Sequence, residues 1–190
     1  MSLNPRSSVP KPQATTPDPD VIRLLVLDVD GVLTDGSIVL DEHGHETKRF
    51  HVRDGLGIKL LRDNGVDVAV LSARASRAVS LRMKELKVTL VSQGNADKEA
   101  GLARLLEQAG VSADHAAYMG DDLQDLPAMQ RCAYRISVPD APREVRDVAH
   151  HVTFVPGGRG AVRDAAEHLL RTQGKWRQAI AEYTGGRSHR

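Results

Sequence analysis

The stretch that decides the fold is Val21–Gly31, with the sequence VIRLLVLDVDG. Its leucines and β-branched residues form a continuous apolar run without alternation, which is typical of a central parallel strand buried on both faces. The run ends at two carboxylates, Asp28 and Asp30. In an open α/β sheet, ligands bind beyond the carboxyl ends of the strands, so this stretch predicts both a strand and a site.

Four further short apolar runs follow, and helical patterns separate them. The runs cover residues 66–72, 88–92, 116–119 and 134–138, and the helical patterns cover residues 54–64, 75–86 and 97–109. Strands that alternate with helices predict βαβ crossovers. The expected fold class is therefore α/β, a doubly wound parallel sheet of the Rossmann-like type.

One segment interrupts this alternation. Residues 37–40 and 46–52 have the pattern of two strands around a polar tip, so we expect an inserted β-hairpin over residues 36–52. A long helical stretch is expected from Ala161 to about Tyr183.

The two ends of the chain differ in composition from the rest. Residues 1–20 hold five of the nine prolines, mixed with Ser, Thr and Gln. Such a segment buries too little apolar surface to offset its ordering entropy. We predict a disordered tail at 1–20, a single domain at 21–184 and a flexible end at 185–190, in a chain of 190 residues.

Composition excludes several classes of partner. A net charge of +1 and 3% aromatic residues provide neither the basic field nor the stacking surfaces of nucleic-acid binders. No apolar run approaches the roughly 18–20 residues that span a bilayer. The single cysteine, Cys132, cannot form an internal disulfide, which favours a reducing compartment. We therefore expect a cytoplasmic protein that binds neither nucleic acid nor membrane.

Acidic, hydroxyl and lysine side chains lie just beyond the carboxyl ends of the predicted strands. In chain order they are Asp28, Asp30, Ser72, Lys98, Asp121 and Asp122. Crowded carboxylates repel one another unless a cation is present, and few hard oxygen ligands suit Mg²⁺. The Ser72 hydroxyl and the Lys98 ammonium suit a phosphoryl group. One carboxylate of the DVD sequence can attack phosphorus while the other moves a proton, so the set predicts a Mg²⁺-dependent phosphatase that forms an aspartyl-phosphate.

These motifs resemble those of the haloacid dehalogenase superfamily, in chain order. Longer segments resemble, within it, the 3-deoxy-D-manno-octulosonate 8-phosphate phosphatase subfamily, which has no separate cap domain. These segments are DVDGVLTDG at 28–36, FHVRDGLGIK at 50–59, LSAR at 71–74, GDDLQDLP at 120–127 and GGRGAVR at 157–163. The resemblance covers about residues 22–180 and implies hydrolysis of that sugar-acid phosphate, a step toward the lipopolysaccharide inner core.

The resemblance also implies catalytic and metal-binding roles. Asp28 would be the nucleophile and Asp30 the general acid and base. Mg²⁺ would be held by Asp28, by Asp30 through its backbone carbonyl, and by Asp121. Ser72 and Lys98 would hold the phosphoryl group. A further pair, Asp122 and Asp125, would orient the ligands and waters.

The implied substrate contacts form a larger set. They are Asp30, His51, Val52, Arg53, Asp54, Gly55, Lys59, Arg74, Arg82 and Lys98. Arg74 and Arg82 are two helical turns apart on roughly one side, which suits a ligand with both a phosphate and a carboxylate. The family usually has Asn where this chain has His51, Arg where it has Lys59, and Gly where it has Ala73. These departures leave the predicted chemistry intact and bear on substrate identity.

The resemblance further implies a homotetramer in which the hairpin of one subunit helps to close the site of a neighbour. An isolated hairpin is marginal in water, which agrees with such a role; the alternative is a hairpin folded back on its own domain. The helix from Ala161 resembles a segment that reaches toward a site, or it packs on its own sheet.

Three other functions stay open from the residues alone. The first is a phosphatase of a nine-carbon, sialic-type acid phosphate, which would share every catalytic motif. The second is a receiver domain, although there the phosphorylated Asp follows the third strand, whereas DVD here follows the first. The third is a non-catalytic oligomeric scaffold, against which the intact motif residues argue.

Overall fold

The computed structural model describes residues 19–185, and its centre is one six-stranded parallel sheet. The order across the sheet is β5-β4-β1-β6-β7-β8. The strands are β1 Leu24–Leu27, β4 Asp67–Leu71, β5 Leu90–Ser92, β6 Ala116–Gly120, β7 Tyr134–Ser137 and β8 His151–Val152. The predicted tail, apart from residues 19 and 20, and the predicted end beyond residue 185 lie outside the described residues.

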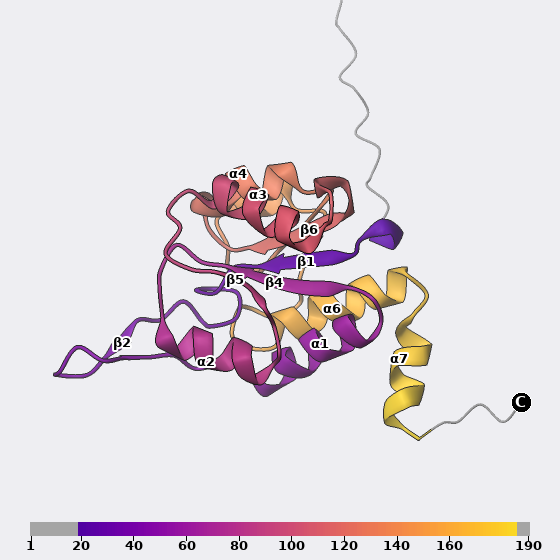
Figure 1. Cartoon of the computed structure of the whole chain (residues 1–190), viewed down its shortest axis with the longest axis horizontal. Helices are drawn as coiled ribbons and strands as arrows, with labels where there is room; N and C mark the ends of the chain where they lie inside the picture. The colour runs from indigo at the N-terminus through magenta and orange to yellow at the C-terminus, as the bar shows by residue number, and fades with distance from the viewer. Residues whose placement is uncertain (1–18, 186–190) are drawn as a thin grey trace, which may run out of the picture.

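Helices cover both faces of this sheet, which confirms the predicted doubly wound α/β fold. They are α1 Val52–Asp63, α2 Arg77–Glu85, α3 Lys98–Ala109, α4 Leu126–Arg131, α5 Arg143–Val148, α6 Ala161–Thr172 and α7 Trp176–Tyr183. In Figure 1, α3 and α4 lie on one face, and α1, α2 and α6 lie on the other. Three 3₁₀ turns complete the described part: η1 Pro19–Val21, η2 Ala113–His115 and η3 Leu123–Asp125.

Strand β1 lies at the point where the strand order reverses. All four of its residues are fully buried, as the unbroken apolar run predicted. Leu27 pairs with Val70 of β4 on one side and with Met119 of β6 on the other. The residues that follow these three strands therefore lie close together at one edge of the sheet. This edge, at the point where the strand order reverses, is where open α/β sheets bind ligands.

Helix α3 begins where its sequence predicts. The Asp97 carboxylate accepts a hydrogen bond from the Ala100 amide at 2.9 Å, which caps the first turn, and Gly110 ends the helix with a φ of 63°. Lys98 is the first helical residue, so the cap fixes its position beside the ends of the strands.

The inserted hairpin is present and protrudes from the body of the molecule (Figure 1). Its antiparallel strands are β2 Val39–Leu40 and β3 Glu46–Thr47, shorter than predicted. Val52, which we expected at the end of the second strand, instead opens α1 after the cap residue His51.

The C-terminal stretch, which we expected to be one long helix, is two. Helix α6 ends at Thr172 and α7 begins at Trp176, with Gly174 between them at a φ of 66°. A left-handed glycine is a common way to end a helix, so the break has a local cause. Among residues 19–185, none of the helices combines the length and apolar character needed to cross a membrane.

Candidate active site at the carboxyl ends of the strands

The sequence-predicted acidic, hydroxyl and lysine residues converge beyond the ends of β1, β4 and β6. Asp28 directly follows β1, Ser72 follows β4 and Asp121 follows β6, while Lys98 opens α3. Asp28, Ser72 and Lys98 are each at most 3% exposed. Asp28, Asp30 and Ser72 also line a small cavity of about 160 Å³. The geometry therefore brings together residues that are distant in sequence.

Lys98 ties two carboxylates together inside the protein. Its Nζ lies 3.0 Å from Asp28 Oδ1 and 2.6 Å from Asp125 Oδ1. Burial alone would lower the pKa of Lys98, but the charges of Asp28 and Asp125 outweigh this effect and raise the pKa above its ordinary value. Lys98 is therefore a fixed positive charge next to Asp28.

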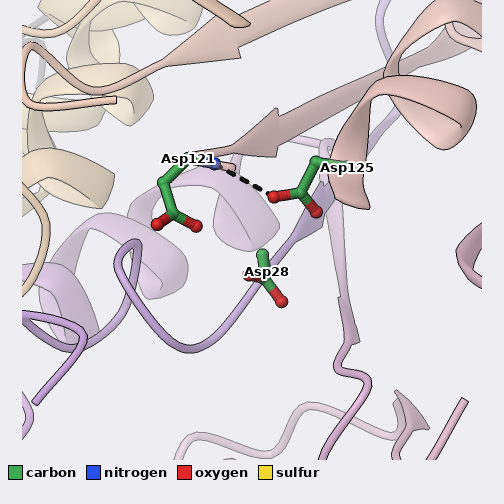
Figure 2. A group of neighbouring side chains, drawn as sticks. All are labelled: Asp28, Asp121 and Asp125. Carbon is green, nitrogen blue, oxygen red and sulfur yellow. Dashed lines mark hydrogen bonds between the residues drawn. The ribbon is translucent and has the colours of Figure 1, made fainter. Parts of the chain in front are cut away.

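Asp125 is fully buried, and both of its carboxylate oxygens have donors. Oδ1 accepts from Lys98 and, at 2.8 Å, from the Tyr118 hydroxyl. Oδ2 accepts from the amides of Asp121 at 3.1 Å and Asp122 at 3.2 Å, the first of which is drawn in Figure 2. Asp125 therefore holds the turn that carries Asp121. The side chain of Asp122 is exposed and caps η3 through the Leu123 amide at 2.7 Å.

The carboxylates of this cluster fit a hard divalent cation. Asp28, Asp121 and Asp125 each offer an oxygen within 4.8 Å of the others, and Figure 2 shows them around one space. Burial, and then the charges of Asp28 and Asp125, raise the pKa of Asp121 to about 8. Burial and then the Asp125 charge raise the pKa of Asp28 to about 6. One oxygen of Asp121, Oδ1, is buried without a hydrogen-bond partner. A cation would satisfy that oxygen and relieve the repulsion, and Asp28 and Asp121 have the free oxygens to bind it.

Ser72 presents its hydroxyl toward the cavity in an ordered position. The Arg74 amide donates to Ser72 Oγ at 3.2 Å. Because the hydroxyl accepts that bond, its own hydrogen is available to an oxygen in the cavity.

Asp30 lies at the edge of the cavity and contacts residues of the hairpin. Its Oδ1 accepts a charged hydrogen bond from Lys48, and its Oδ2 lies 4.0 Å from Arg74 Nε. Glu46 forms ion pairs with both Arg74 and Lys48. Neither Lys48 nor Glu46 was predicted from the sequence, because no motif marks a lysine and a glutamate in a polar hairpin.

The predicted substrate residues from His51 to Gly55 do not line the cavity of Asp28. Asp54 is 2% exposed and accepts from the Arg163 amide at 2.9 Å, so it caps the first turn of α6. His51 caps α1 by accepting from the Arg53 amide at 3.3 Å, and Val52 is exposed on the first turn of that helix.

Arg74 and Arg82 do not share a helical face, contrary to the spacing argument. Arg74 precedes α2, which begins at Arg77, and it faces Asp30. Arg82 lies within α2 and lines a separate cavity of about 740 Å³, together with Gly55 and Lys59 of α1. The helical period was applied across a loop, which is why the prediction failed.

Comparisons with known proteins agree with this geometry. A profile described as haloacid dehalogenase-like hydrolase matches residues 90–156. The 3-deoxy-D-manno-octulosonate 8-phosphate phosphatase KdsC of Haemophilus influenzae is 46% identical over 154 residues, which cover 81% of this chain and 86% of that protein. The chain belongs to the 3-deoxy-D-manno-octulosonate 8-phosphate phosphatase family. KdsC of Escherichia coli K12 is 41% identical, over 83% of this chain and 84% of that protein.

Solved structures of this phosphatase family have the same fold. The cobalt-bound phosphatase of H. influenzae superposes with a TM-score of 0.82 at 42% identity, over 86% of this chain and 98% of that one. The phosphatase of Moraxella catarrhalis, in complex with magnesium, phosphate and KDO, gives a TM-score of 0.84 at 39% identity, over 87% and 95%.

Proposed function

We propose that the chain is a Mg²⁺-dependent phosphatase that hydrolyses 3-deoxy-D-manno-octulosonate 8-phosphate to the free sugar acid and inorganic phosphate. One observation carries the proposal: Asp28, Lys98 and Asp121 meet at the switch point of the sheet, with one Asp121 oxygen buried and unpartnered. Family membership supplies the substrate, since the curated relatives are named for it.

In the first half-reaction, a carboxylate oxygen of Asp28 attacks phosphorus. The phosphorus–oxygen bond to the sugar breaks, and Asp30 gives a proton to the leaving oxygen. The Ser72 hydroxyl donates to a phosphoryl oxygen, and Lys98 offsets the charge that collects on the group in transfer. This step leaves an acyl phosphate on Asp28 and releases the neutral alcohol of the sugar acid.

In the second half-reaction, water attacks the phosphorus of the aspartyl-phosphate and gives its proton to Asp30. The acyl-phosphate bond breaks, which restores the Asp28 carboxylate and releases inorganic phosphate. Asp28 and Asp121 would hold the cation, with the backbone carbonyl of Asp30 as a third protein ligand. A bound Mg²⁺ supplies charge neutralisation at the phosphoryl oxygens.

The assembly belongs to the same proposal. The hairpin exposes three consecutive apolar residues, Ile38, Val39 and Leu40, each more than half accessible. A homotetramer in which hairpins of neighbouring subunits close the sites would cover this surface. It would also give a role to Lys59 and Arg82, which lie outside the cavity of Asp28 in their own chain. A cytoplasmic location fits the lone free thiol of Cys132.

A substrate panel tests the function. The purified protein with Mg²⁺ should release phosphate from 3-deoxy-D-manno-octulosonate 8-phosphate faster than from other sugar phosphates. Faster turnover of a nine-carbon acid 9-phosphate would contradict the substrate assignment and favour the alternative, on which Lys59 and His51 bear. The Asp28→Asn variant should lose turnover by at least about 10⁴-fold while keeping its fold, because no other group supplies the nucleophile.

A further inference from the structure

Lys48 is a buried lysine on an exposed hairpin. It follows β3 by one residue, yet its side chain is 2% exposed. Its neighbours on the hairpin behave differently: the side chains of Glu42 and Arg49 are 87% and 77% exposed. The Lys48 ammonium therefore leaves the hairpin surface and enters the body of the protein.

The partners of this ammonium are two carboxylates. It donates to Asp30 Oδ1 and lies 3.4 Å from Glu46 Oε1. Burying a charge is unfavourable unless it is well paired, and an apolar residue of similar size would serve stability as well or better. The burial of Lys48 therefore does not by itself indicate a purely stabilising role. The ion pair instead fixes the orientation of the Asp30 carboxylate.

The pair orients the carboxylate that faces the reaction. Lys48 fixes Oδ1 of Asp30, and the other oxygen, Oδ2, lies toward Arg74, which lines the 160 Å³ cavity with Asp28 and Asp30. Glu46 in turn holds the Arg74 guanidinium, so both groups beside Asp30 are anchored to the hairpin. We propose that Lys48 is a positioning residue, which holds Asp30 so that its Oδ2 reaches the leaving oxygen; this inference rests on the proposed function.

The proposal predicts a dependence on the leaving group. When Asp28 attacks phosphorus, an alkyl ester needs a proton from Asp30 on the departing oxygen, because an alkoxide leaves poorly. An aryl ester such as p-nitrophenyl phosphate releases a stable phenolate and needs no proton. A misplaced Asp30 should therefore slow the cleavage of alkyl esters and spare that of aryl esters, whereas a general disturbance of the fold would slow both equally.

The experiment compares Lys48→Met with wild type in single-turnover reactions with Mg²⁺, in which release of the leaving group is followed directly. One substrate is the sugar-acid phosphate and the other is p-nitrophenyl phosphate. The alkyl ester should lose about 30-fold or more in rate with little change in KM, and the aryl ester should change less than about threefold. Lys48→Arg should restore part of the loss, because it keeps the charge at nearly the same reach.

Arg49→Met is the matched control, since it removes a cation from the adjacent position, where Arg49 pairs with Asp35 at 2.8 Å. It should leave both rates near wild type. Equal losses on the two esters in Lys48→Met, or no loss on either, would overturn the inference alone. A wild type that cleaves neither ester would overturn the proposed function and this inference with it.

Discussion

Asp121 and Asp28 are neighbouring carboxylates, and when both are ionised their negative charges repel each other. Burial and the neighbouring carboxylates raise the pKa of Asp121 to about 8 and that of Asp28 to about 6, from an ordinary value of 3.8. The folded chain therefore keeps protons that the unfolded chain has already released between pH 4 and pH 8. As pH rises through this window, the free energy of unfolding of the metal-free protein falls.

The stabilisation of the fold by Mg²⁺ should therefore depend on pH. The cation replaces those protons, so Mg²⁺ should raise Tm more at pH 8 than at pH 5.5, with roughly 2–4 °C for each kcal/mol gained. Thermal unfolding of chelator-treated protein, with and without Mg²⁺ at both pH values, measures this difference. Asp121→Asn serves as the control, because it removes one titrating ligand and should shrink the gain. An equal Mg²⁺ effect at the two pH values would contradict the metal assignment.

At the scale of elements, the loop before α6 is pressed against the loop that carries the nucleophile. The Gly158 amide donates to Val32 O at 3.0 Å. A Cβ on Gly157 would lie 1.8 Å from Gly31 O, so only glycine allows this approach. Asp54 of α1 caps the first turn of the same helix, through the Arg163 amide. The element from residue 157 to α6 is therefore a support for the turn after β1.

Gly157→Ala should damage activity beyond its effect on stability. The clash with backbone atoms must displace one of the two loops, at a cost of about 1–3 kcal/mol, and a shift of about 1 Å near Asp28 can lower kcat by about 100-fold. Gly174→Ala is the matched control, because Gly174 has a φ of 66° but open space around a Cβ. It should cost about 1–2 kcal/mol with kcat unchanged. Urea unfolding and steady-state kinetics on both variants measure the split, and equal kcat values would contradict the supporting role.

Much of the fold could be predicted from the sequence, because the local patterns of apolar residues agree with the strands and helices of the final structure. The apolar runs predicted the strands of the sheet, and the helical pattern over residues 97–109 predicted α3 to within one residue. The break at Gly174 was overlooked, although a glycine at that point carried a signal for it. The hairpin strands and the contact between Lys48 and Asp30 depend on tertiary packing, which leaves no periodic trace in a polar segment.

The same limit applied to the candidate site. Asp28, Ser72, Lys98 and Asp121 could be predicted to meet because each follows a strand or opens a helix at one edge of the sheet. The position of Arg82 could not be predicted in the same way, because the cavity that it lines depends on how α2 packs against α1.

In the whole molecule, the candidate catalytic groups, a second set of charged residues and the exposed apolar residues lie in three separate regions. The nucleophile, Lys98 and the candidate metal ligands lie at the edge of the sheet, whereas Lys59 and Arg82 line a second cavity between α1 and α2. The hairpin protrudes from the body of the molecule (Figure 1). Its apolar residues Ile38, Val39 and Leu40 are exposed. A single subunit therefore holds the groups for phosphoryl transfer but leaves the apolar residues of its hairpin exposed, and packing against other subunits would cover them.

Val39→Asp tests this interpretation directly. Val39 is 53% exposed, so a charge there should spare the fold of the subunit but disfavour packing of hairpins against one another. Wild type should elute at four times the 20.7 kDa chain mass in size exclusion with light scattering, and the variant at a lower mass. Its KM for the sugar-acid phosphate should rise by about tenfold or more, because a neighbour no longer closes the cavity.

Val21→Asp is the control for this experiment. Val21 is 42% exposed in η1 before β1 and lies at the opposite end of that strand from Asp28, so both mass and KM should stay at wild-type values. A wild type that is already monomeric at full activity would show that each subunit closes its own site, and the hairpin would then act only through its contacts with Asp30 and Arg74.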